Sequence, residues 1–143
     1  MAETVRDTIH ELLDQARATI DAILDAGDPE LPMPSSHVCT QGRDVWALIT
    51  NDIDHEIIHH GQVAEARYEA RVAPSPAERL SAEWLEKRAR FVGSLIGLTE
   101  EQFNQETAPD GWTYRQVAAH LLLVERDSLK TLAADRAARE GAP

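Results

Sequence analysis

The sequence predicts an all-α protein, a four-helix bundle built as a single domain from residues 1–143. Hydrophobic residues make up 43% of the chain but aromatic residues only 5%, and the abundant Ala, Leu, Glu and Arg favour helices. Apolar residues recur at helical spacing in four segments, and no strand alternation is seen. We therefore expect four helices, at roughly 3–26, 44–72, 76–98 and 113–136.

A long proline-containing segment separates the first two predicted helices. Gly27 supplies a stop for the first helix, and three prolines within residues 29–34 keep the following chain extended. Residues 28–43 are therefore expected to form an irregular loop, which is long enough to suggest a role of its own. Cys39 lies in this loop, and we interpret it as an incidental thiol, with a metal contact or redox role as the less favoured alternative.

Three capping boxes mark helix starts in the second half of the chain. At each start a hydroxyl residue is followed three positions later by Glu or Gln. The pairs are Ser75 with Glu78 for the third helix, Thr99 with Gln102 for one short turn, and Thr113 with Gln116 for the last helix. The sequence Pro109-Asp110-Gly111 predicts a turn before the last helix. The tail after Asp135 is small and charged, and we expect it to fray.

The net charge of −11 restricts the classes of partner. A polyanion is repelled, which argues against nucleic acid and against anionic membrane surfaces, whereas a cation is attracted. The single cysteine excludes an internal disulfide, and no apolar run reaches the ~20 residues of a membrane span. The N-terminus lacks the pattern of a signal peptide, so we expect a cytoplasmic protein.

Two histidines in the second predicted helix form a candidate chelating pair. His55 and His59 are four residues apart, so on a helix they lie one turn apart on one face. On a helical wheel, the buried direction is that of Val45, Leu48, Ile49 and Val63, with His59 in this sector and His55 at its edge. Asp52 and Glu56 also point inward on the wheel, and such ionisable groups are costly to bury unless they bind a cation.

His120 is the candidate third ligand, because it borders the apolar stripe of the last helix. Three protein ligands with one open position are typical of a catalytic metal site, and imidazole suits zinc, nickel, copper or iron. The alternative is that these histidines are ordinary half-exposed surface residues. We interpret His10 and His37 as surface or loop residues, and His60 as a residue that packs or hydrogen-bonds in the core, with Gln62 as a supporting partner.

Two segments of the chain resemble the DinB-like (YfiT-like) family of helical bundle proteins. The matching residues are Gly111-Trp112-Thr113, Gln116 to Leu121 and Glu125 in one segment, and His55, His59, Gly61 and Gln62 in the other. The resemblance implies a divalent metal ion, with zinc or nickel favoured and iron a third choice, bound by three histidines that map onto His55, His59 and His120. It also implies a metal-dependent enzyme, since relatives include transferases and isomerases that use thiols such as mycothiol or bacillithiol.

The order of the two segments is reversed relative to the family. Residues 3–72 resemble its second half and residues 76–136 its first half, which predicts a circularly permuted bundle joined around Pro74. The alternative is that two chains exchange halves, so that the site forms across a homodimer.

The preferred functional hypothesis is a metal-dependent transferase, isomerase or hydrolase that acts on a small molecule, with a low-molecular-weight thiol as partner. Glu56 and Asp52 are candidates for a general-base or ligand-supporting role. Trp112 is expected to pack at the helix start rather than to touch substrate. The alternatives are a non-catalytic helical interaction domain and a di-iron carboxylate bundle; Glu56 and His59 have the Glu-x-x-His spacing of the latter, but the sequence holds no second copy.

Overall fold

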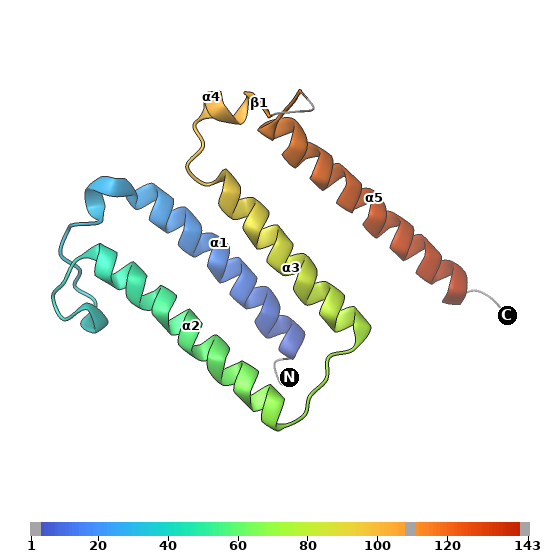
Figure 1. Ribbon diagram of the computed structural model, residues 1–143, viewed down its shortest axis with the longest axis horizontal. Coiled ribbons are helices and arrows are strands. Elements are labelled where there is room, and N and C mark those ends of the chain that lie inside the picture. The colour runs from blue at the N-terminus through green and yellow to red at the C-terminus, as the bar shows by residue number, and fades with distance from the viewer. Residues whose placement is uncertain (1–3, 108–110, 141–143) are drawn as a thin grey trace. The chain divides into compact units, whose positions relative to one another are not determined.

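The computed structural model describes residues 4–107 and 111–140 and confirms that the protein is all-α. Its helices are α1 (Val5–Glu30), α2 (Val45–Glu69), α3 (Pro76–Leu95), the short α4 (Glu100–Phe103) and α5 (Tyr114–Glu140), with a 3₁₀ turn η1 (Val38–Thr40) (Figure 1). The chain divides into two compact units, Met1–Ala73 and Pro74–Pro143. Within each unit, two long helices run in opposite directions (Figure 1). The expectation of one bundle over residues 1–143 remains a prediction.

The predicted capping boxes are present at all three helix starts. The Ser75 amide donates to the Glu78 carboxylate at 2.7 Å, and the Glu78 amide donates back to the Ser75 hydroxyl at 3.3 Å. The same reciprocal bonds join Thr99 to Gln102 and Thr113 to Gln116. These bonds satisfy backbone donors that have no partner inside the helix, which is why the starts could be predicted closely.

The helix ends were predicted less well than the starts. Gly27 (φ 59°, ψ 177°) breaks the first helix at the predicted stop, but a short helical stretch that was not predicted follows it to Glu30. The last helix continues to Glu140, so the expectation of a frayed tail after Asp135 was wrong for residues 136–140. One ion pair one turn apart, Arg136 with Glu140 at 2.9 Å, supports this last turn.

The loop between α1 and α2 is more ordered than expected. Residues 28–30 are helical and η1 follows, so the irregular stretch is shorter than 28–43. Thr40 is completely buried, and its hydroxyl donates to the His37 carbonyl at 2.7 Å. The Trp46 amide donates to the Leu31 carbonyl at 2.9 Å, which ties the start of α2 to the end of α1. This loop therefore fixes where α2 begins.

A short hairpin precedes α5 and was not predicted. Strand β1 (Glu106–Thr107) pairs antiparallel with β2 (Trp112–Thr113), with Thr107 opposite Trp112. The expected turn at Pro109-Asp110-Gly111 lies partly outside the described residues, but Gly111 has φ 68°, a conformation that favours glycine. Two-residue strands carry no alternation pattern, so the sequence could not reveal them.

Neither unit buries the apolar stripe of its long helices. Among the described residues, only Thr40 and Ala47 are buried. Leu12 of α1 is 61% exposed and Ile57 of α2 is 65% exposed. A helix with an apolar stripe needs another layer to cover it, and a two-helix unit offers too little surface to do so.

The second unit is held by a polar contact between its two long helices. Arg88 of α3 forms an ion pair with Glu125 of α5, and both side chains are mostly covered, with 23% and 28% exposed. The Arg88 guanidinium also lies 5.2 Å from the centre of the Trp84 ring. Because both charges are partly shielded from water, this pair should contribute more than a surface pair does.

We predict that Arg88→Ala and Glu125→Ala show a coupling free energy of about 1 kcal/mol in a double-mutant cycle of urea unfolding. The control cycle uses Arg136 and Glu140, which are 76% and 67% exposed and should couple by only about 0.3–0.5 kcal/mol. Equal coupling free energies in the two cycles would show that the Arg88–Glu125 pair stabilises the fold no more than an exposed pair does.

Candidate metal-binding site

Helix α2 places His55 and His59 as a neighbouring pair, as the four-residue spacing predicted. Their ring centroids are 5.9 Å apart and the ring planes are inclined by 24°, so the imidazoles are stacked along the helix. Both side chains are exposed. The two rings therefore share one face of α2 and are open to an ion from solution.

Local hydrogen bonds define which nitrogen of each ring is available. Nδ1 of His55 lies 2.9 Å from the Asn51 carbonyl oxygen and 3.2 Å from the Asn51 side-chain amide. Nδ1 of His59 lies 2.8 Å from the side-chain oxygen of Gln62. The Asn51 side-chain nitrogen can only donate, and it would bond Nδ1 of His55 in the tautomer that lacks a proton there. A carbonyl oxygen can only accept, so the contacts to the two oxygens favour the tautomer with the proton on Nδ1. Nε2 of each ring then carries the lone pair that a metal ion needs.

Gln62 is hydrogen-bonded to His59, three residues earlier on the helix. This contact to a candidate metal ligand agrees with the supporting role expected of Gln62. His60 is exposed, and so the expectation that it packs in the core is not met within this unit. His10 and His37 are exposed, as expected of surface or loop residues.

The α2 face that carries the pair is not covered within its unit, contrary to the helical-wheel expectation. Val45, Leu48 and Ile49 are half-buried, but Val63 is 59% exposed. All described side chains of α2 from Asp52 onward are exposed, including the two histidines. The reason is that α2 packs closely only at its first turns, against η1, while the rest of the face lacks a covering helix in the unit.

His120 lies on α5, in the second unit, where an aromatic contact sets its surroundings. The Trp112 and His120 ring centroids are 5.0 Å apart and their planes are inclined by 83°, an edge-to-face arrangement. Trp112 was expected to pack at the start of the last helix, and the structure places it there and also against this imidazole. The sequence held no periodic signal for this contact, because Trp112 lies in β2, outside the helix, and its place follows from the hairpin pairing.

An open hollow of about 400 Å³ lies beside His120 on the surface of α5. Its walls are mainly apolar, with one amide and the imidazole as polar groups. The lining residues are Trp112, Gln116, Ala119, His120 and Leu123.

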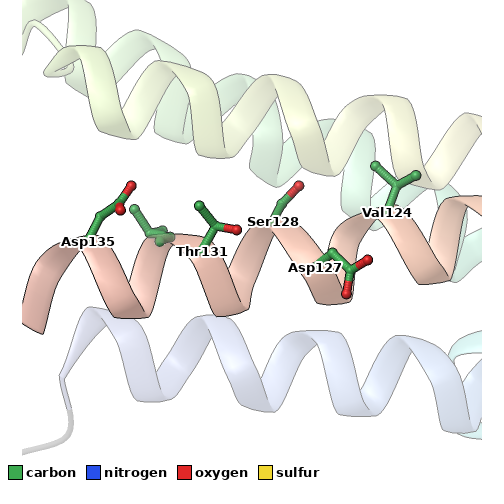
Figure 2. Close-up of a pocket in the computed structure, with 6 residues that line it drawn as sticks. Val124, Asp127, Ser128, Thr131 and Asp135 are labelled. Atoms are coloured by element: carbon green, nitrogen blue, oxygen red, sulfur yellow. The ribbon is translucent and has the colours of Figure 1, made fainter.

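A second hollow, of about 530 Å³, lies farther along α5 and holds no histidine (Figure 2). The side chains of Asp127, Ser128, Thr131 and Asp135 line it together with Val124 and Leu132. Asp127 also pairs with Lys130 at 3.3 Å. Because this hollow is a shallow face of one helix, we assign it no chemistry.

Within residues 4–107 and 111–140, no three His, Cys, Asp or Glu side chains come together in a way that could hold a metal ion. Asp52 and Glu56 therefore do not join the histidine pair as a third ligand in this part of the chain. Both carboxylates are exposed. Cys39 lies in η1, and its side chain is outside the described part of the structure.

Residues 84–143 match the family model described as the mycothiol maleylpyruvate isomerase N-terminal domain. This domain is part of the DinB/YfiT-like metal-dependent helical family. No curated protein and no solved structure matches the chain.

The matched segment contains Trp112 and His120 but neither His55 nor His59. The match thus bears directly on the candidate third ligand, while the pair depends on its spacing, its ring geometry and the resemblance of its own segment. None of the helices in the described ranges combines the length and the apolar content that crossing a bilayer requires.

We predict that nitrogen-15 NMR of the metal-free chain, at a pH where the histidines are neutral, shows the proton of His55 and of His59 on Nδ1. Gln62→Ala should shift His59 toward the Nε2–H form, because the acceptor for Nδ1–H is removed. His55 is the internal control, since its partner is Asn51. A His59 tautomer that does not respond to Gln62→Ala would contradict this assignment.

Proposed function

We propose that this protein binds one divalent metal ion through His55, His59 and His120. The observation that carries the proposal is the arrangement of His55 and His59, whose Nδ1 atoms are engaged by Asn51 and Gln62 and whose Nε2 atoms are available. Metal-ligating histidines usually donate their other ring N–H to such an oxygen. His120 supplies the third ligand from the segment that belongs to a metal-dependent family.

The proposed ligands suit zinc or nickel best, with iron as a third choice, because neutral imidazole is a ligand of intermediate softness. A three-histidine set leaves a coordination position for water or substrate, as in catalytic rather than structural sites. A metal ion at this position would supply the charge that lowers the pKa of a bound water or thiol. The net charge of −11 also favours a cation over a polyanion as guest.

We propose further that the protein is an enzyme that uses a low-molecular-weight thiol, as a transferase or isomerase, with a hydrolase as the alternative reaction type. The support is the match of residues 84–143 to the N-terminal domain of mycothiol maleylpyruvate isomerase. The hollow beside His120 offers space for a small organic substrate. Glu56 and Asp52, exposed on the helix of the histidine pair, are our candidates for a general base.

The exposed apolar stripes support a bundle in which the two units cover each other. This requires either a circularly permuted chain, in which residues 3–72 complete the family's fold, or a homodimer in which two chains exchange halves. Either arrangement would have to bring His120 close to the pair on α2 for the proposed site to form.

Calorimetric titration with zinc or nickel should give one ion for each set of three histidines. His55→Ala, His59→Ala and His120→Ala should each weaken binding by at least about 100-fold, since even outer-shell partners of metal ligands are worth about 10–100-fold. His10→Ala, an exposed residue of α1, is the matched control and should leave the affinity unchanged. The site is refuted if the purified protein carries no stoichiometric metal and if neither His55→Ala nor His59→Ala changes its stability in added zinc or nickel. That result would favour a non-catalytic interaction domain.

The same titration distinguishes the two assemblies. A chain carrying His120→Ala is unfolded and refolded together with a chain carrying both His55→Ala and His59→Ala. If halves are exchanged between chains, the mixed dimer regains one intact site; if each chain closes its own site, mixing restores nothing. Light scattering of the wild-type protein should agree with the result.

Turnover with a panel of low-molecular-weight thiols, including mycothiol with maleylpyruvate as substrate, tests the enzymatic proposal. We expect thiol-dependent activity that is lost on chelation and reduced by at least about 100-fold in His120→Ala, in line with the loss of metal. Glu101→Ala is a suitable control, because this residue is an exposed carboxylate of α4. Activity that His120→Ala leaves intact would exclude the proposed role of this histidine.

A further inference from the structure

The contact between Trp112 and His120 follows from how the hairpin meets α5. Side chains of an α-helix lean toward the helix N-terminus, so the His120 imidazole leans back along α5 toward β2. Strand β2 holds Trp112 there through its pairing with Thr107. The two rings meet edge-to-face with centroids 5.0 Å apart. The indole is thus held by backbone structure rather than by a flexible loop.

The indole restricts an imidazole that would otherwise be free to change orientation. His120 is exposed, and an exposed side chain exchanges among its staggered rotamers. Edge-to-face packing is a preferred arrangement of aromatic rings, so the contact selects the orientation that the structure shows. Selecting one orientation before binding lowers the ordering cost that a ligand must overcome.

We propose that Trp112 is a positioning residue, whose indole orients the His120 imidazole for metal binding. This inference rests on the proposed function, because it assigns His120 a metal ion to bind. It also gives the hairpin a role: the β1–β2 pairing and the positive φ of Gly111 place the indole that orients the ligand. The hollow beside His120, which Trp112 and Leu123 help to line, is bounded by the same indole.

The test is a calorimetric titration of the full-length chain with nickel(II) alone. Trp112→Phe keeps an aromatic ring and should bind within about twofold of wild type, whereas Trp112→Leu keeps apolar bulk but no ring and should bind about three- to tenfold more weakly. Trp84→Leu removes another indole of the same unit, one that lies beside Arg88 rather than His120, and should leave the affinity unchanged. Circular dichroism should show the same helix content in all variants.

NMR of the His120 ring protons in the metal-free chain provides a second measurement. In the wild type, the ring current of the indole should displace the chemical shifts of these protons. The displacement should change in size in Trp112→Phe and vanish in Trp112→Leu. Because the wild-type spectrum alone tests the contact, this measurement holds even where Trp112→Leu alters folding. Ring protons of the wild type without such a displacement would overturn the proposal.

The variant His120→Ala distinguishes failure of the positioning role of Trp112 from failure of the proposed metal site. If it weakens nickel binding and folded Trp112→Leu does not, the positioning role is wrong and the metal site stands. If neither substitution weakens binding, the proposed participation of His120 fails together with the inference. Equal loss in Trp84→Leu and Trp112→Leu would also count against a specific role of Trp112.

Discussion

Two antiparallel helices can bury only the side chains that lie between them, and the apolar stripes of this chain are wider than that contact. Leu12 and Ile57 remain mostly exposed, and the described residues classed as buried are Ala47 and Thr40, both near the loop that starts α2. Since exposed apolar area is unfavourable in water, the units require a further layer to form a stable domain. The candidate site depends on the same requirement, because its ligands are divided between the two units.

Local chemistry prepares the ligands before any such assembly. Asn51 and Gln62 lie on the same helix as the histidines that they hold, so the orientation of His55 and His59 needs only α2 to be helical. Trp112 acts in an equivalent way on His120, through the adjoining hairpin. The proposed ligand side chains are therefore oriented within their own units.

Features that depend on near neighbours in the sequence were predictable. The three capping boxes, the break at Gly27 and the stacking of His55 on His59 each involve residues within one helical turn. The strands and the Trp112–His120 contact were missed because they depend on hairpin pairing, which two-residue strands do not encode as a pattern. The burial of the α2 face was overestimated, since a helical wheel gives the direction of a stripe but not the element that covers it.

The hairpin and α5 also restrict how this segment can change in length. Trp112 and His120 are separated by eight residues, and each inserted or deleted residue rotates the rest of a helix by about 100°. One insertion between Thr113 and Ala119 would turn the imidazole away from the indole and shift the apolar stripe of α5 together with it. Many substitutions on the exposed side of this stretch leave that angle unchanged. Over an evolutionary lineage, the segment should therefore accept changes of residue far more readily than changes of residue number.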